Sequence, residues 1–326
     1  MGGITGLNTA VELGFEADYG VAVVPTFKVK HTSESFKWSP EYKAEETLIG
    51  NVTEEDSDLV GCSAEGDLGV MARPGVIGKL AAAALGVDAA ELEDGTVGVY
   101  KHSITCITPG VNNSLPSLTI LVNRHVAVKA YTGMKVASFK LESAPKDFVK
   151  ATLSFKGRTE TAGVMQGLPI PTRKAYKFAN GQISIDGTDT SGIVTGFSVG
   201  VENNLDDAEP TLESGIYPSE PEFQKRKITV SLETLFRAET EALREAKFKN
   251  GAYANILLTL TSLEEIEAGE PFKMVISLPR VRILEAHPAA GDSGKLKVTL
   301  SGEAYETTGV DPITIDCYNA DAAAYV

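Results

Sequence analysis

A short sequence segment that occurs twice, here called the repeated phrase, constrains most strongly what this chain can fold into. Residues 150–157 read KATLSFKG and residues 297–304 read KVTLSGEA, with Lys, Thr, Leu and Ser at the same places. Four matches prove little alone, because such residues are common in any β-rich chain. The order of the surrounding segments repeats as well, so we interpret the chain as a tandem duplication.

Short segments of alternating polarity fill both halves. FKVKHT at 27–32 has the period of two that is typical of a half-buried strand, and similar segments follow, separated by Pro, Gly, Asn or Asp. One helix is predicted in each half, at 75–85 and at about 235–249, each followed by a glycine stop. The predicted fold class is mainly β: two tandem antiparallel β-sandwich or barrel domains, each with one flanking α-helix.

The length of 326 residues is also that of about two domains. We predict a first domain at 1–160, a linker rich in Gly and Pro at 161–172, and a second domain at 173–326. The repeat is too long for a solenoid unit, so the two domains form a tandem pair. Copies of one fold joined head to tail close into a ring when the rotation between neighbours divides a full turn.

Composition excludes several functions. The chain has 30 basic and 44 acidic side chains, a net charge of −14, and no basic stripe, which argues against binding to the phosphates of nucleic acid. No apolar run approaches the roughly 20 residues that span a bilayer, and the start lacks a secretory signal, so we expect no membrane partner. Three separated cysteines and four histidines predict neither a disulfide framework nor a metal or cofactor site.

The strongest catalytic pattern is GFSVG at 196–200, which matches G-x-S-x-G with Ser198 as nucleophile and His287 downstream. That motif requires a strand, a strained turn and an immediate helix, whereas an acidic stretch follows here. We therefore predict that the chain is not an enzyme. A serine hydrolase using Ser198 remains one alternative, and a monomeric two-domain β-sandwich module for adhesion or binding remains another.

Two acidic stretches occupy the same slot in the two halves. Residues 41–67 contain nine acids and one base, and residues 202–222 contain seven acids and no base. Such runs are usually solvated surfaces, but their repetition predicts loops that join successive rings or face a lumen. The candidates are Glu41, Glu45, Glu46, Glu54, Glu55, Asp56, Asp58, Glu202, Asp206, Asp207, Glu209 and Glu213.

The first half resembles the tail tube proteins of long-tailed, non-contractile bacteriophages. Four phrases run in the order of that family across residues 14–158. They are GFEADYGVAVVPTFKVKHTSESFKWSPEYKAEE at 14–46, GCSAEGDLGVMARPGVIGKLAAAALG at 61–86, TPGVNNSLPSLTILVNR at 108–124 and YTGMKVASFKLESAPKDFVKATLSFKGR at 131–158. The second half matches through its repeated order.

This resemblance implies a structural virion protein without cofactors. Its β-sandwiches would line a hollow tail tube through which phage DNA passes without specific binding. A chain with two such domains would form stacked trimeric, pseudo-hexameric rings, and the acidic composition predicts an acidic lumen. The implied partners are further copies of the chain, the tape measure protein and the tail terminator and tip proteins. The implied location is the virion tail, after assembly in the host cytoplasm.

Overall fold

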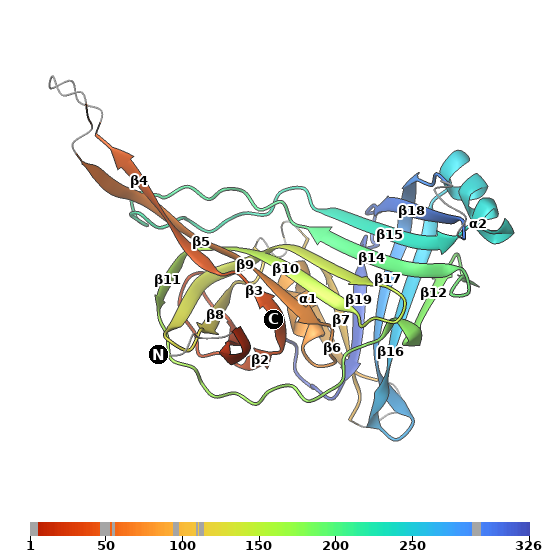
Figure 1. The fold of residues 1–326 in the computed structure, drawn as a ribbon, viewed down its shortest axis with the longest axis horizontal. Helices are drawn as coiled ribbons and strands as arrows, with labels where there is room; N and C mark the ends of the chain where they lie inside the picture. Colours follow the sequence, from red (N-terminus) through yellow and green to blue (C-terminus); the bar gives the residue numbers. More distant parts are fainter. Residues whose placement is uncertain are drawn as a thin grey trace.

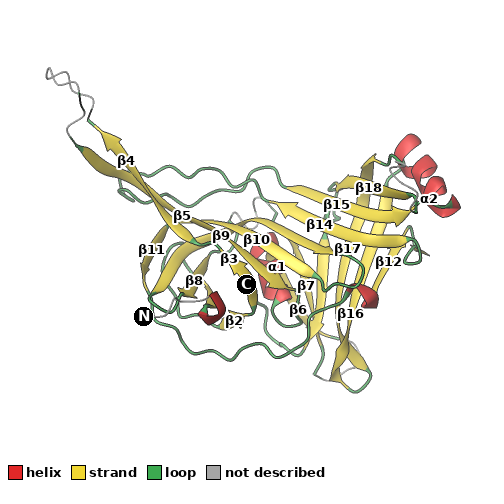
Figure 2. Ribbon diagram, in the orientation of Figure 1, coloured by secondary structure: helices red, strands yellow, loops and turns green. Residues whose placement is uncertain are grey.

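The computed structural model describes residues 6–45, 53, 56–93, 98–108, 110, 114–288 and 295–326. Antiparallel strands make up most of this part of the chain, and helices are few (Figures 1 and 2). The predicted mainly β class is therefore confirmed.

Strands of the first half include two long ones, β5 and β9, that extend beyond their immediate neighbours. β4 and the start of β5 form a hairpin that projects from the body of the molecule (Figure 1). The strands are β1 (Ala10–Phe15), β2 (Phe27–Val29), β3 (His31–Glu34), β4 (Lys37–Ala44), β5 (Ser57–Met71), β6 (Gly86–Leu92), β7 (Tyr100–Cys106), β8 (Leu118–Asn123), β9 (Val128–Ser143), β10 (Lys150–Gly157) and β11 (Thr159–Ala162).

Strands of the second half include the long hairpin of β16 and β17. Its strands are β12 (Gly181–Ile185), β13 (Thr188–Asp189), β14 (Val194–Glu202), β15 (Lys227–Leu235), β16 (Ala254–Glu267), β17 (Glu270–Glu285), β18 (Lys297–Ala304) and β19 (Thr314–Asn319).

The strands of the two halves pair in the same order. In the first half β4, β5, β10, β9, β8 and β1 are successive neighbours, and in the second half β14, β15, β18, β17, β16 and β12 are. The repeated phrase is part of this pattern. Its first copy, β10, pairs with residues 64–71, and its second copy, β18, pairs in the same register with residues 228–235. The sequence repeat is therefore also a repeat of strand pairing.

Pairing between β9 and β14 joins the two halves. Their register runs from Ser143 opposite Phe197 to Ser138 opposite Glu202, so one antiparallel sheet crosses the chain in the order β5, β10, β9, β14, β15, β18. β19 also returns to the first half and pairs with β7. β11 occupies the start of the predicted linker, and the division into domains at 1–160 and 173–326 stays a prediction.

The helices of the two halves differ in burial. α1 (Ile77–Leu85) lies among the strands of the first half, and all its residues except Lys79 are buried (Figure 2). An apolar helix surface on all sides requires such a site. Gly86 ends it in the left-handed region, with φ of 101°, which favours glycine. α2 (Ala238–Leu243) continues as a π-helical stretch, Arg244–Lys249, at the surface of the second half. Both predicted helices are found, with shifted ends.

The chain terminus is tied to the first half by a buried histidine. Nδ1 of His102 lies 2.9 Å from Asp88 Oδ2, and its Nε2 lies 2.8 Å from the carbonyl oxygen of Asp321. Because both neighbours are acceptors, both ring nitrogens donate and the ring carries a positive charge. The ring of Tyr325 stacks on it at 4.2 Å. Burial opposes this charge, but the Asp88 hydrogen bond leaves the pKa of His102 raised.

Charged His102 should stabilise the fold in a pH-dependent way. Since its folded pKa is raised, the contribution is complete below about pH 6.5 and is lost as pH rises through the folded value. We expect His102→Gln to lower the free energy of unfolding most at acidic pH. Urea unfolding at about pH 6 and about pH 9 measures this, and His125→Gln, at an exposed turn, is the control. An equal loss at both pH values would contradict a charged His102.

Candidate functional site: the junction of the two halves

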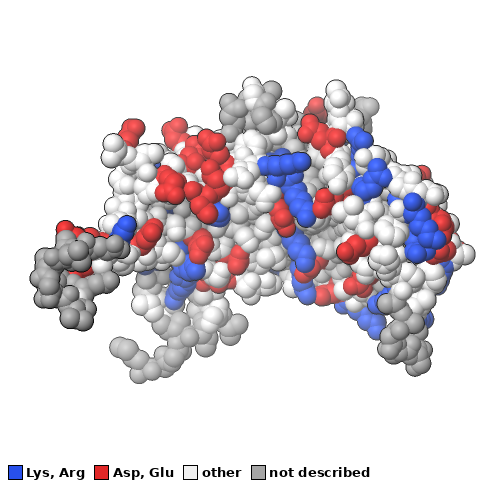
Figure 3. Space-filling view, turned by 90° about the horizontal axis from the view of Figure 1, so that it is seen from above, with Lys and Arg blue, Asp and Glu red and all other residues white. Residues whose placement is uncertain are grey.

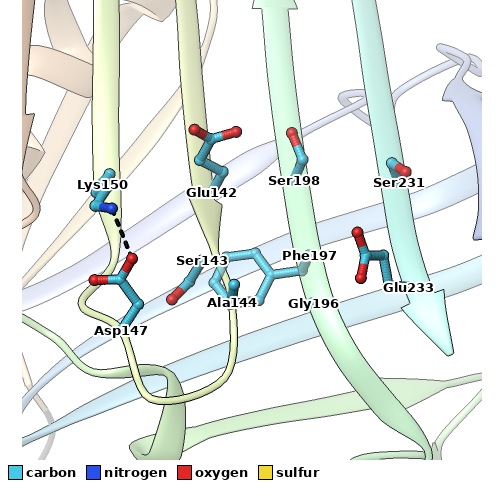
Figure 4. A pocket seen from close by; sticks show the side chains of 10 residues that line it. All are labelled: Glu142, Ser143, Ala144, Asp147, Lys150, Gly196, Phe197, Ser198, Ser231 and Glu233. Carbon is cyan, nitrogen blue, oxygen red and sulfur yellow. Dashed lines mark hydrogen bonds and ion pairs between the residues drawn. The ribbon is translucent and has the colours of Figure 1, made fainter. Parts of the chain in front are cut away.

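The sheet shared by the two halves has one polar face. Residues directly opposite each other on neighbouring strands share a face, so the register identifies its members. Figure 4 shows Lys150, Glu142, Ser198 and Ser231 side by side on four neighbouring strands at one end of it. Its acids are Glu65, Asp67, Glu142, Glu202, Glu233 and Glu303, and its lysines are Lys135, Lys140, Lys150, Lys156, Lys227 and Lys297.

Charges on this face are largely matched. Lys140 lies 2.6 Å from Glu142, and Lys227 lies 3.1 Å from Glu303. Serine and threonine fill many of the positions between them, as at Ser198 and Thr229. The opposite face carries buried apolar side chains such as Leu153 and Val199, which belong to the core. The polar face is thus a surface of nearly balanced charge backed by a packed core.

Ser198 lies in the middle of β14, which continues to Glu202 without a turn or helix. A nucleophile elbow needs both. Among the described residues no hydrogen bond joins Ser198 to a histidine, and His287 instead contacts the ring of Phe248 edge-on at 5.2 Å. The shallow depression around Ser198 also contains Asp147, which pairs with Lys150 at 2.6 Å (Figure 4). The arrangement lacks the geometry of a Ser–His pair.

Residues 203–226, here named the covering segment, link β14 to β15 and run across the first half (Figure 1). Asn203 fixes both ends: its side-chain nitrogen donates to the carbonyls of Ala84 and Val136, and its oxygen accepts from Arg226. Farther along, the carbonyl of Ile216 accepts from the backbone N–H of Cys62 at 3.0 Å. These bonds hold a long irregular segment against another half of the chain.

An apolar contact and an exposed ion pair add to this attachment. Leu205 packs with Ile107 and Leu115 in a small buried cluster. The ammonium group of Lys156 donates to the carbonyl of Leu205 at 3.1 Å and lies 2.6 Å from Asp207 Oδ1. Asp207 is almost fully exposed, so this ion pair contributes little by itself.

Lys135 on β9 is the most deeply buried ionic group of the junction. Its side chain is 2% exposed and donates to Ser114 Oγ at 2.6 Å, Glu220 Oε1 at 2.7 Å and the carbonyl of Pro221 at 3.1 Å. Three acceptors therefore satisfy its three donor hydrogens. Burial lowers the pKa of Lys135, and Glu220 only partly opposes that shift. Burial alone would raise the pKa of Glu220, but the hydrogen bond from Lys135 leaves this pKa lowered.

The structure places the predicted acidic residues in two groups. Glu41, Glu45, Asp56 and Asp58 lie on the projecting hairpin, whereas Glu202 ends β14 and Asp206, Asp207, Glu209 and Glu213 lie on the covering segment. Glu46, Glu54 and Glu55 lie outside the described residues. Figure 3 shows acidic side chains gathered on the part of the upper face nearer the hairpin. Their predicted role in joining rings or facing a lumen stays a prediction.

Sequence reasoning missed the residues that hold the covering segment. Lys135 sits in an alternating strand and Asn203 follows another, so neither position stands out from the sequence. Glu220 was only one of several acids in its stretch. A lysine within an otherwise apolar run, GMKVA at 133–137, was the one available signal of a buried cation.

Comparison with known families identifies the chain. A family model described as phage tail tube protein matches residues 6–305. The chain belongs to the phage tail tube family. No curated protein sequence matches it significantly. No described helix has the length and apolar character to cross a membrane. The chain is therefore a structural protein of the virion tail, and its junction is an element of a tail tube subunit.

The junction of this tail tube protein should depend on Glu220 far more than on Asp207. Glu220→Gln weakens the partner of a buried ammonium group, which costs roughly 1–3 kcal/mol when such a group is left poorly satisfied. Asp207→Asn changes an exposed pair and should leave stability unchanged within error. Urea unfolding of both variants at neutral pH compares them. Equal stabilities would contradict the structural role given to the Lys135–Glu220 pair.

Proposed function

We propose that three chains close into a ring and that such rings stack into the hollow tail tube through which phage DNA is delivered. The observation that carries this proposal is the repetition of strand order and register in the two halves. Two similar units in one chain supply six units from three chains, and a closed ring leaves no sheet edge exposed. The units are the predicted domains at 1–160 and 173–326.

The polar face of the shared sheet is the surface that we assign to the bore of the tube. It carries six acids, on β5, β9, β14, β15 and β18, and six lysines, of which Lys135 is buried beneath the covering segment. A basic wall would bind DNA by releasing its counterions, whereas a slightly acidic one repels it. The net charge of −14 supports the same conclusion for the whole subunit.

The proposal also covers the partners of the tube, its place of assembly and the absence of catalysis. The tape measure protein would occupy the bore before DNA, and the terminator and tip proteins would close the ends. Assembly would take place in the host cytoplasm. We also propose that the chain has no catalytic activity, which the position of Ser198 inside a continuous strand supports. The adhesion-module alternative predicts a discrete monomer instead.

Negative-stain electron microscopy of the purified chain tests this proposal. We expect hollow filaments of constant diameter built from stacked rings at high protein concentration. Ser198→Ala is the matched control, because its partly exposed hydroxyl forms no hydrogen bond with any described residue and its loss should leave the filaments unchanged. Separate monomers at every concentration would contradict the proposal.

A further inference from the structure

The projecting hairpin and the covering segment occupy equivalent places in their halves. One connects β4, which follows β3 along the same edge of β5, to β5 itself, and the other connects β14 to β15. A register shift separates His31 from Ser33 in the first half and Val194 from Gly196 in the second. With the strands aligned through the repeated phrase, the two shifts fall at the same position. The duplication therefore includes this irregularity.

The projecting hairpin and the covering segment also match at paired positions farther along. In the hairpin Tyr42 is opposite Leu59, and in the covering segment Leu205 is opposite Phe223 at the corresponding pair of positions. We name the hairpin, described at residues 37–45, 53 and 56–62, the arm. The arm and the covering segment are thus two copies of one hairpin.

The two copies differ in what covers them. Leu205 of the covering segment is 7% exposed because it packs on the first half, whereas its equivalent, Tyr42 of the arm, is 60% exposed. Trp38 and Val60, at the base of the arm, are exposed by 36% and 44%. Trp38 and Tyr42 share one face of β4, and exposed apolar side chains that share a face of a projecting hairpin are typical of a surface that becomes covered by a partner.

The surface that would receive the arm can be located by the same equivalence. Ser154 and Ser301 are matching serines of the repeated phrase; the first lies opposite Ser138 and the second opposite Glu285. β17 of the second half therefore corresponds to β9 of the first. On this alignment Arg282 stands where β9 has Lys135.

On the side away from β18, the edge of β17 beside residues 282–285 has no paired strand among the described residues of the single chain, and the π-helical stretch packs just beyond it, where Arg244 Nε donates to the carbonyl of Ala286 at 2.8 Å. β16 begins at Ala254, opposite Val281, so among the described strands none continues along that edge beside residues 282–285. Leu284 is 47% exposed there. Arg282 stacks on the ring of Tyr253 at 4.0 Å, and it forms no ion pair with any described carboxylate. Partly exposed Arg282 and exposed Leu284 thus lie at the positions equivalent to those where β9 contacts the covering segment.

We propose that the arm of one chain docks on β17 of a second copy of this chain, as the covering segment docks on the first half. Asp56 lies three residues before Leu59, as Glu220 lies three before Phe223, so Asp56 is the acid that meets Arg282. This inference rests on the proposed ring, because it makes the contact between chains a copy of the contact within the chain.

The same alignment assigns the apolar and backbone parts of the contact. Tyr42 of the arm covers Leu284, and Ser39 lies opposite Glu285, as Glu202 lies opposite Ser138 within the chain. Pro40 stands at the place of Asn203, whose N–H donates to Ala137. Proline cannot donate that bond, so the contact between chains depends more on side chains.

Disulfide trapping in the full chain tests this register. Opposed residues on antiparallel strands have Cβ atoms about 4.5–5.5 Å apart, close to what a disulfide needs. In a Ser39→Cys, Glu285→Cys variant under assembly conditions, mild oxidation should give covalent species of two and three chains on a non-reducing gel. The native cysteines are buried and should not contribute.

The matched control is Ser39→Cys with Ser138→Cys. Ser138 is the equivalent of Glu285 but is already paired with Glu202 in its own chain, so no species larger than one chain is expected. Filaments in the microscope without cross-linking of the Ser39–Glu285 variant would overturn the docking register and leave the tube intact. Monomers without cross-links would overturn the ring itself.

Charge reversal supplies a second test that does not depend on cysteine geometry. Asp56→Arg and Arg282→Asp should each reduce the filament yield several-fold, and the two combined should restore most of it. Thermal unfolding of the unassembled chains should be unchanged by Asp56→Arg, because Asp56 is exposed there. Full assembly of both single variants, or no recovery in the double variant, would overturn the Asp56–Arg282 contact.

Discussion

The backbone ladder between β9 and β14 is the interaction on which the rest of this structure depends. It joins residues 138–143 to residues 197–202 and so turns two similar sets of strands into one sheet. It also places the covering segment over the first half, where Lys135 becomes buried beneath Glu220. Without that ladder the polar face would end at β9, and β14 would no longer position the covering segment over the first half.

Much of the fold could be predicted from the sequence, because alternating polarity and a repeated phrase are local signals. The strands around KATLSFKG and KVTLSGEA and the helix at Ile77–Leu85 were all visible in this way. The sharing of one sheet by the two halves was not, since strand pairing between distant segments leaves no local pattern. The burial of Lys135 likewise depends on Glu220, a residue far away along the chain.

The acidic stretches take on a physical meaning that their charge alone did not give. On the covering segment, Glu220 is tied to the buried Lys135 of the first half, so it acts in attachment rather than as a free solvated surface. On the arm, Asp56 is exposed and pairs with no lysine among the described residues of its own chain. One copy of the hairpin, the covering segment, thus docks on the other half of its own chain. The other copy, the arm, projects from the chain, and the proposed ring continues from it.

The most direct test of the central claim, that two equivalent units per chain build the ring, is the symmetry of the assembled tube along its axis. Cryo-electron microscopy of the filaments should show three chains per ring, with six similar β units around the bore. Rings of six chains, or a ring in which the two halves of each chain occupy different radii, would contradict it.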